Sequence, residues 1–146
     1  MPYQFPGHCR CGGSQVEFHS QHPLNQLSPR ACDCDFCTER QLHWLSDPAG
    51  KLFVHFEQPY VIQQQGSGQA QFLTCAGCGT VIAVTFPFQP QRLGALNSDV
   101  LDEKAQLQHS ALVSPKQLNP KEKKQRWQKA WMAISIEGES AKEYRE

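Results

Sequence analysis

Seven cysteines, arranged in three short groups, are the residues of this sequence best suited to chemistry. The groups are Cys9-Arg10-Cys11, Cys32-Asp33-Cys34-Asp35-Phe36-Cys37 and Cys75-Ala76-Gly77-Cys78. An odd count argues against a complete set of disulfides, and a bridge between such close neighbours would close a strained ring. Zinc binds thiolates tetrahedrally with bonds of about 2.3 Å, and cysteines two or three positions apart can reach one ion. The sequence therefore predicts metal binding, with Zn²⁺ as the ion.

The seven cysteines divide naturally into four plus three. The central group already supplies three thiolates within a short stretch, although spacing alone does not say which pairs share a metal. The outer pairs, Cys9 with Cys11 and Cys75 with Cys78, would then close a four-cysteine site that contributes folding energy. Three ligands on a tetrahedral ion leave one position for water or substrate, as catalysis requires. We therefore predict two zinc ions per chain.

Residues beside the cysteines suit these sites. Gly79 follows the last cysteine, where glycine permits the tight turn of a zinc knuckle. We expect Asp35 to cap a short helix running through Leu42, with Cys37 in its first turn, where free N–H groups favour a thiolate. Asp33 and Asp35 are interpreted as turn and cap residues rather than metal ligands.

Histidines and arginines are assigned ordinary roles. None of the histidines has a partner at metal-site spacing: His8, His19, His22, His43, His55 and His109. His8 and His43 lie nearest the cysteine groups in the sequence. We expect them to donate hydrogen bonds to the metal-binding cysteines at most, and not to bind the metal. The arginines that flank the cysteines are expected to offset the negative charge of the thiolate sites: Arg10, Arg30 and Arg40.

Short strands should position the cysteines. Apolar, β-branched or alternating stretches predict strands near residues 16–18, 52–56, 60–62, 71–74, 81–86 and 93–96. A turn at Gly66-Ser67-Gly68 would make a hairpin that delivers Cys75, and Pro87 and Pro90 should end the strand after it. The signal from 97 to 118 is weak.

The C-terminal part predicts one helix over about 120–132. Asn119 followed by Pro120 is a good helix start, and Trp127 and Trp131 share one face with Ala130. We expect the tryptophans to pack on the sheet while the basic residues face water: Lys121, Lys123, Lys124, Arg126 and Lys129. The fold class is therefore mainly β, a predominantly antiparallel two-layer structure with zinc sites and a C-terminal helix outside it.

Composition limits the function classes. At 146 residues the chain fits a single domain. Because only 39% of the residues are hydrophobic and ten Gly and ten Pro interrupt the chain, we expect no large, purely apolar core and a contribution of metal to the stability of the fold. Zero net charge, from 14 basic and 14 acidic residues, gives no electrostatic reason to bind nucleic acid or an anionic membrane. We expect no signal peptide and no membrane span, a cytoplasmic location and a small-molecule partner. The oligomeric state is not indicated.

The order of the motifs resembles a known enzyme family. Gly7-His8-Cys9-Arg10-Cys11-Gly12 leads into a strand, Cys32-x-Cys34-x-x-Cys37 follows, and Phe72-Leu73-Thr74-Cys75-x-x-Cys78-Gly79 comes next. In this respect the chain resembles the glutathione-dependent formaldehyde-activating enzyme family, which includes the centromere protein V type proteins and has a β-tent fold. The resemblance covers about residues 5–100, including Gly94-Ala95-Leu96-Asn97.

The resemblance implies a division of labour between two zinc ions. It places a structural zinc on Cys9, Cys11, Cys75 and Cys78 and a catalytic zinc on Cys32, Cys34 and Cys37. It also implies a carbon–sulfur lyase that forms or breaks the adduct of glutathione with formaldehyde.

The role of the metal and the substrate are left open by the residues themselves. Zinc would either hold the thiol as a thiolate or polarise the aldehyde carbonyl. No cluster of Arg or Lys that would hold glutathione's two carboxylates is evident in the sequence. The alternative is a non-catalytic binding module braced by zinc, and an iron–sulfur protein is disfavoured because Cys-x-Cys is not the usual cluster spacing.

Overall fold

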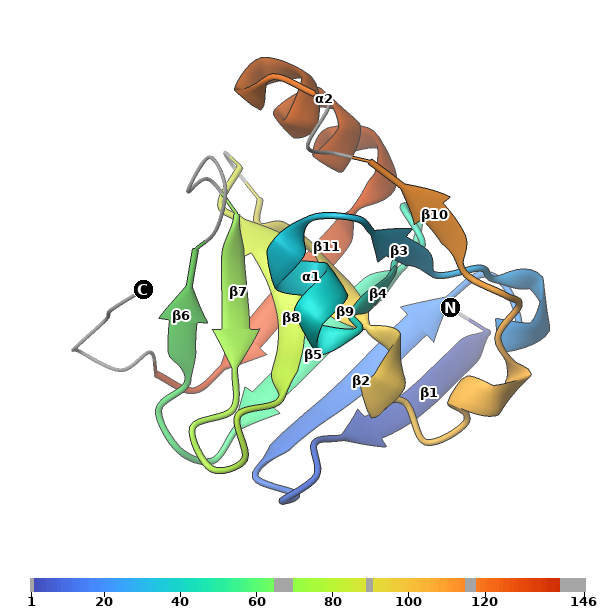
Figure 1. Ribbon diagram of the computed structural model, residues 1–146. Helices are drawn as coiled ribbons and strands as arrows, with labels where there is room; N and C mark the ends of the chain where they lie inside the picture. Colours follow the sequence, from blue (N-terminus) through green and yellow to red (C-terminus); the bar gives the residue numbers. More distant parts are fainter. Residues whose placement is uncertain (1, 65–69, 89–90, 115–117, 140–146) are drawn as a thin grey trace.

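The computed structural model describes residues 2–64, 70–88, 91–114 and 118–139, and its fold is mainly β, as predicted (Figure 1). The strands are β1 (Tyr3–His8), β2 (Ser14–Ser20), β3 (Arg30–Cys32), β4 (His43–Leu45), β5 (Lys51–Phe56), β6 (Val61–Gln63), β7 (Gln71–Thr74), β8 (Val81–Phe86), β9 (Leu93–Asn97), β10 (Ala111–Val113) and β11 (Met132–Glu137). The α-helices are α1 (Asp35–Arg40) and α2 (Pro120–Ala130), and 3₁₀ turns cover Leu24–Gln26, Ser98–Val100 and Lys104–Gln106. The predicted turn at Gly66-Ser67-Gly68 and the predicted stop at Pro90 lie outside the described residues.

The sheet branches at β9. One side of β9 pairs with β8, which continues to β7 and β6. On its other side, the first residues of β9 pair with β11, which leads to β5, β2 and β1, and its last residues pair with β4, which leads to β3 and β10. At Gly94 the strands approach so closely that a Cβ would lie 2.5 Å from the Val84 carbonyl oxygen. The branch therefore requires glycine at this position.

Most strand pairings are antiparallel, as expected, but two are parallel. β11 runs parallel to β5, and β10 runs parallel to β3. Parallel neighbours require a long crossover connection, and the chain from β5 to β11 passes through β6, β7, β8, β9, β10 and α2. The C-terminal segment thus returns to the middle of the sheet, an arrangement that the sequence did not indicate.

Both helices differ slightly from their predicted bounds. α2 begins at Pro120, after the N-cap Asn119, which forms a complete capping box with Glu122. The helix ends at Ala130 because the chain enters β11 at Met132. In α1 the N-cap is Cys34 rather than Asp35, so that prediction was wrong. The helix ends at Arg40 rather than Leu42, because Gln41 takes a left-handed conformation with φ 53°.

The core is divided into two hydrophobic clusters, each of which supports one group of cysteines. The larger cluster lies among β2, β5, β7, β8 and β9 and includes Cys9 and Cys75. The second includes Cys37, Trp44 and Phe72, together with residues of α1 and the end of α2. In the described part of the chain, none of the helices has the length and apolar character needed to cross a membrane.

Candidate metal centres and the adjoining pocket

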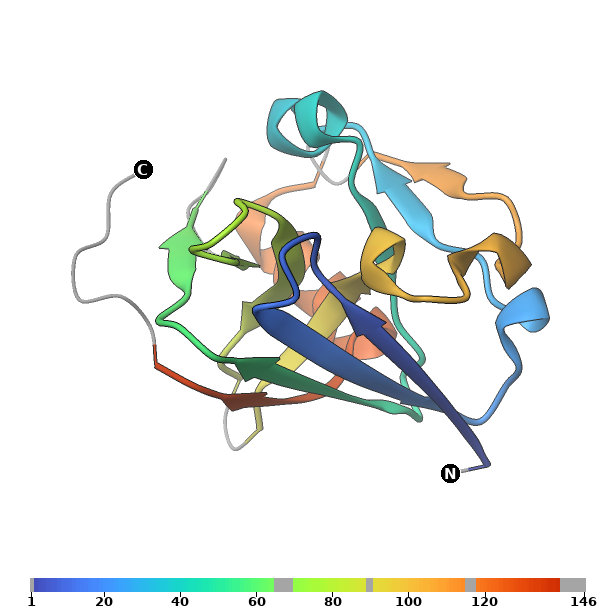
Figure 2. The ribbon, with the colours of Figure 1, turned by 90° about the horizontal axis from the view of Figure 1, so that it is seen from below.

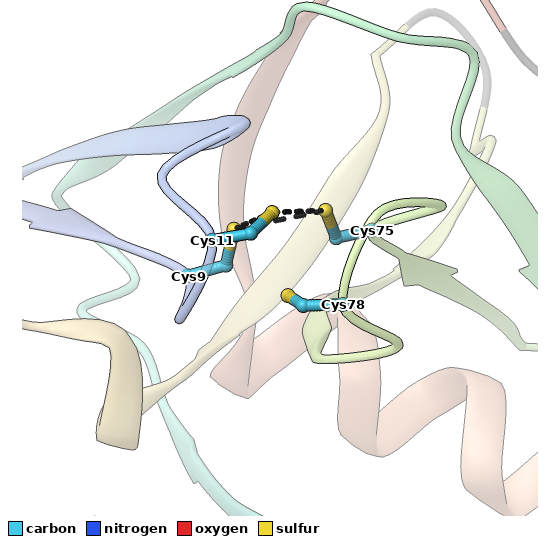
Figure 3. A group of neighbouring side chains, drawn as sticks. All are labelled: Cys9, Cys11, Cys75 and Cys78. Carbon is cyan, nitrogen blue, oxygen red and sulfur yellow. Dashed lines mark hydrogen bonds between the residues drawn. The ribbon is translucent and has the colours of Figure 1, made fainter.

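Four cysteines meet between two turns of the chain. Cys9 and Cys11 lie between β1 and β2, Cys75 and Cys78 lie between β7 and β8, and their side chains point toward one another (Figure 3). The Sγ atoms of Cys9 and Cys11 are 3.5 Å apart, Cys75 Sγ is 3.6 Å from each, and all four sulfurs lie within 4.8 Å of one another. A tetrahedral ion with bonds of about 2.3 Å needs sulfurs about 3.8 Å apart. This group, the turn cluster, can therefore hold a metal ion.

The two turns of this cluster have matching backbones. In each turn, the N–H of the first cysteine donates to the carbonyl of the residue five positions later. This hydrogen bond is 3.0 Å long in the turn that begins at Cys9 and 2.9 Å long in the turn that begins at Cys75. Each also contains a glycine with positive φ, 78° at Gly12 and 75° at Gly79. The turns lie next to each other at the end of the molecule opposite α2 (Figures 1 and 2). The predicted tight turn at Gly79 is confirmed.

The surroundings of the turn cluster suit thiolates. The backbone N–H of Gly13 donates to Cys11 Sγ at 3.4 Å. Burial raises the pKa of Cys78, but the Thr80 hydroxyl, 3.1 Å from its sulfur, and backbone donors lower it to about 5. Burial raises the pKa of Cys75, but the nearby Ser14 hydroxyl and backbone donors lower it overall. In the described part of the chain, this buried hydroxyl has no partner in normal hydrogen-bond geometry. A thiolate bound to metal is the acceptor that this hydroxyl lacks.

The three central cysteines form a second group, the pocket cluster. Cys32 ends β3, Cys34 caps α1, and Cys37 lies in the first turn of that helix, as predicted. The Cys37 N–H donates to Cys34 Sγ at 3.4 Å, and the Trp44 indole N–H donates to Cys37 Sγ at 3.4 Å. The three sulfurs lie within 4.8 Å of one another. This group too can hold a metal ion.

The protons of the pocket cluster are unequally distributed. Hydrogen bonds from the Cys32 and Cys37 thiols lower the pKa of Cys34 to about 2, with backbone donors adding to the effect. The hydrogen bond to Cys34 raises the pKa of Cys32 to about 11, and hydrogen bonds with both neighbours raise the pKa of Cys37 as well. Cys34 is therefore the thiol of the three with the lowest pKa, and metal binding would release the protons held by the other two.

No fourth His, Cys, Asp or Glu joins the pocket cluster among the described residues. Asp33, which lies between two of its cysteines, accepts a hydrogen bond from the Ser114 hydroxyl and so joins β3 to the segment after β10. His43 bonds to Ser110 at 2.8 Å, and His8 pairs with Asp102 at 3.0 Å. Among the described residues, no carboxylate or imidazole joins the three sulfurs, although one oxygen of Asp33, Oδ1, is buried without a hydrogen-bond partner.

A pocket of about 380 Å³ adjoins these three cysteines. Its walls are largely aromatic and apolar, formed by Phe36, Trp44, Ala70, Phe72, Val84, Val113, Trp127, Ala130 and Trp131. Its charged lining residues are Arg30, Asp35, Lys123 and Arg126. Sites for small organic molecules commonly have this size and composition.

One face of α2 provides a wall of the pocket. The lining residues of this helix and its end follow the spacing of a single helical face: Lys123, Arg126, Trp127, Ala130 and Trp131. The rings of Trp127 and Trp131 stack at 4.7 Å, and Trp127 also contacts Phe86 at 5.9 Å. The tryptophans pack inward, as predicted. Arg126 is exposed, as expected, and Lys123 is half-buried, and both also line the pocket beside these rings.

Arg30 is the third cation of the pocket. Its guanidinium donates to the Ser46 hydroxyl at 2.7 Å, and that hydroxyl donates to the Ala130 carbonyl at 2.6 Å, which ties β3 to the end of α2. Burial lowers the pKa of Arg30, and repulsion from Arg126 lowers it further. The sequence suggested no such cluster of cations, because its members come from segments far apart in the chain.

The other two arginines that flank the cysteines, Arg10 and Arg40, do not line this pocket. Arg10 donates to the Cys78 carbonyl at 3.4 Å, beside the turn cluster. Arg40 donates to the Phe36 carbonyl at 3.1 Å and lies over that ring, 3.8 Å from its centre. It thus braces α1.

Comparison with known proteins supports the fold. The chain is similar to a crystal structure described as a Rhodobacter sphaeroides protein, with a TM-score of 0.53 and 21% identity over 80% of this chain and 93% of that chain. The sequence matches no protein-family model and no curated protein. At this level of identity the likeness establishes the shared fold alone, so function must be argued from the site.

Proposed function

We propose that the protein is a zinc-dependent carbon–sulfur lyase that forms or breaks the adduct between a small thiol, such as glutathione, and formaldehyde or another small aldehyde. The observation that carries the proposal is the pocket cluster. Cys32, Cys34 and Cys37 converge beside an aromatic pocket, and no fourth protein ligand joins them in the described residues. Three thiolates on a tetrahedral ion characterise a site that can accept a substrate atom.

The reaction needs no oxidant or reductant. The thiol sulfur forms a bond to the aldehyde carbon, the carbonyl π bond breaks, and the thiol proton ends on the new hydroxyl oxygen. Zinc in this site would lower the pKa of a bound thiol or polarise the carbonyl. Asp35 is the one carboxylate among the described residues that line the pocket, and it can hold the proton in transit.

The chain's own residues prepare this site in two ways. The indole of Trp44 bonds to Cys37 Sγ and fixes the orientation of this ligand. The aromatic walls give the site a largely apolar lining, which strengthens electrostatic interactions beside it. The support for the lyase is therefore an oriented, open set of ligands beside a pocket large enough for an organic thiol.

The proposal assigns a structural zinc to the turn cluster. Cys9, Cys11, Cys75 and Cys78 form a complete four-sulfur set, and Cys9 and Cys75 are buried. Such sites stabilise folds and leave no position for substrate. A fourth ligand in the pocket cluster would instead have favoured the alternative of a binding module braced by two closed sites.

The test combines metal counting with an exchange assay. Native mass spectrometry should find two zinc ions per chain and, after thiol is added, a thiol adduct. NMR exchange spectroscopy should show faster exchange of ¹³C-formaldehyde with glutathione than in buffer. Cys34→Ser should abolish the acceleration while the second zinc remains in the turn cluster. Exchange at the uncatalysed rate for every small aldehyde tested, with zinc loaded, would refute the lyase.

A further inference from the structure

We propose that α2 carries a carboxylate-binding subsite, in which Arg126 and Lys123, together with Arg30, hold a carboxylate group of the substrate. This inference rests on the proposed function, since it describes the part of the substrate that does not react. Two of the three residues, Lys123 and Arg126, lie on α2, after the part of the sequence that resembles the enzyme family.

The first argument is the placement of charge. All three cations line the pocket, Arg30 from β3 and Lys123 and Arg126 from one face of α2. Within the described residues, none of the three has a carboxylate partner within 4.0 Å. Cations gathered at an apolar pocket favour the binding of an anion between them. Their arrangement is therefore that of a site prepared for an anion.

The metal site does not balance this charge. Three thiolates on a divalent ion carry one net negative charge, and Asp35 adds one more. The three cations still leave one positive charge over. A carboxylate would neutralise it where the ligand reaches the metal as a neutral thiol, and the fork of a guanidinium matches a carboxylate in two hydrogen bonds.

The second argument is the rigidity of the subsite. Arg30 is held by Ser46, whose hydroxyl also bonds to the end of α2 at Ala130. The helix is fixed at its start by the capping box and at its end by the stacked pair of Trp127 and Trp131. Side chains on such a frame can select a ligand by the position of its charge.

The test compares two thiols that differ only in the charged group. 3-Mercaptopropionate and 3-mercaptopropan-1-ol have equal length, and only the first has a carboxylate. Their dissociation constants would be measured on zinc-loaded protein by tryptophan fluorescence. All three tryptophans of the chain line this pocket, so the signal reports on this site. We expect the carboxylate to bind about tenfold more tightly, with a preference that weakens at high salt.

Two variants of α2 give a matched comparison. Arg126→Gln should reduce the tenfold preference to about threefold or less, and Arg126→Lys should restore part of it. Lys129→Gln removes the same charge from the same helix but lies outside the pocket lining, and it should keep the preference. Because Arg126 and Lys129 are both exposed, neither glutamine variant should change the melting temperature.

The outcomes separate this inference from the lyase. Equal binding of the two thiols, no binding of either, or a preference that survives in both Arg126→Gln and Lys123→Gln would overturn the subsite. If the neutral thiol still exchanges with formaldehyde faster than in buffer, the lyase stands without the subsite. If the carboxylate preference depends on Arg126 but neither thiol is turned over, the subsite stands and the lyase fails.

Discussion

Removing metal from the turn cluster should destabilise the fold far more than removing it from the pocket cluster. The perturbation is a pair of matched double variants, Cys11→Ser with Cys78→Ser, and Cys32→Ser with Cys34→Ser. Each takes two sulfurs from one cluster and leaves too few to hold an ion. None of these four cysteines is among the buried ones, and serine at position 34 remains a good N-cap for α1.

The expected difference follows from chain length between ligands. Cys9 and Cys75, which meet in the turn cluster, are 66 residues apart, whereas the pocket cluster lies within a single stretch from Cys32 to Cys37. The chain-entropy relation for cross-links gives about 4 kcal/mol for the long loop and about 2 kcal/mol or less for the short one. For a protein of this size, about 4 kcal/mol lowers the melting temperature by about 10 °C.

The assay is thermal unfolding followed by circular dichroism, with zinc per chain counted by native mass spectrometry on the same samples. Each double variant should lose one ion. The melting temperature of the turn-cluster variant should be about 10 °C lower than that of the wild type. The melting temperature of the pocket-cluster variant should fall by about half as much or less. Equal destabilisation by the two variants, or a turn-cluster variant that loses its ion but keeps its melting temperature, would refute the reasoning.

Three further predictions concern the fold. Burial raises the pKa of Asp47, but three hydrogen-bond donors lower it overall, so its stabilisation is complete above about pH 4 and is lost as pH falls through its lower folded pKa. Asp47→Asn should therefore cost about 1–3 kcal/mol in urea unfolding at pH 7, and a gap that did not close below pH 4 would contradict this. Asn119→Ala removes the capping box and should lower stability by about 1 kcal/mol, with reduced helical ellipticity; unchanged values would argue against that cap. Gly94→Ala forces a Cβ against the Val84 carbonyl and should cost more than about 2 kcal/mol in the same unfolding assay, so wild-type stability would show that the strands can separate freely.

Local spacing was sufficient to predict the cysteine clusters and the regular strands. Cysteines two or three positions apart must lie together in any fold, and β2, β5, β7, β8 and β9 show apolar or alternating sequences. The pairing of Cys9 and Cys11 with Cys75 and Cys78 followed from counting ligands. The metal, by contrast, can be named only from chemistry, because both clusters fit the general requirements of an ion.

The missed strands carry weak or misleading local signals. β3, β4 and β10 are three residues long, too short for a periodic pattern to appear. β1 contains Pro6 and Gly7, which are depleted in strands but tolerated at the edge of a sheet, where β1 lies. In β11 the apolar residues Met132, Ile134 and Ile136 do alternate, and this signal was visible, but the first of them was assigned to the preceding helix.

The cations of the pocket were missed because a tertiary arrangement creates them. Arg30 precedes the pocket cysteines, whereas Lys123 and Arg126 come about ninety residues later and reach the site only because β11 returns α2 to the sheet. A signal did exist in the helix itself. Lys123 and Arg126 share the face of Trp127 and Trp131, and a face that mixes cations with aromatic rings differs from an ordinary solvated one.

The position of α2 separates the residues that set the charge and shape of the pocket from the metal ligands. The helix has 11 residues, none fully buried, and isolated helices of this length are marginal in water. It is held by its cap, by the stacked tryptophans, and by β11, which pairs with both β5 and β9. None of these anchors involves a cysteine. Substitutions on the pocket face of α2 therefore change the charge and shape that a ligand meets without disturbing either metal cluster, and selectivity should be separable from metal binding in this fold.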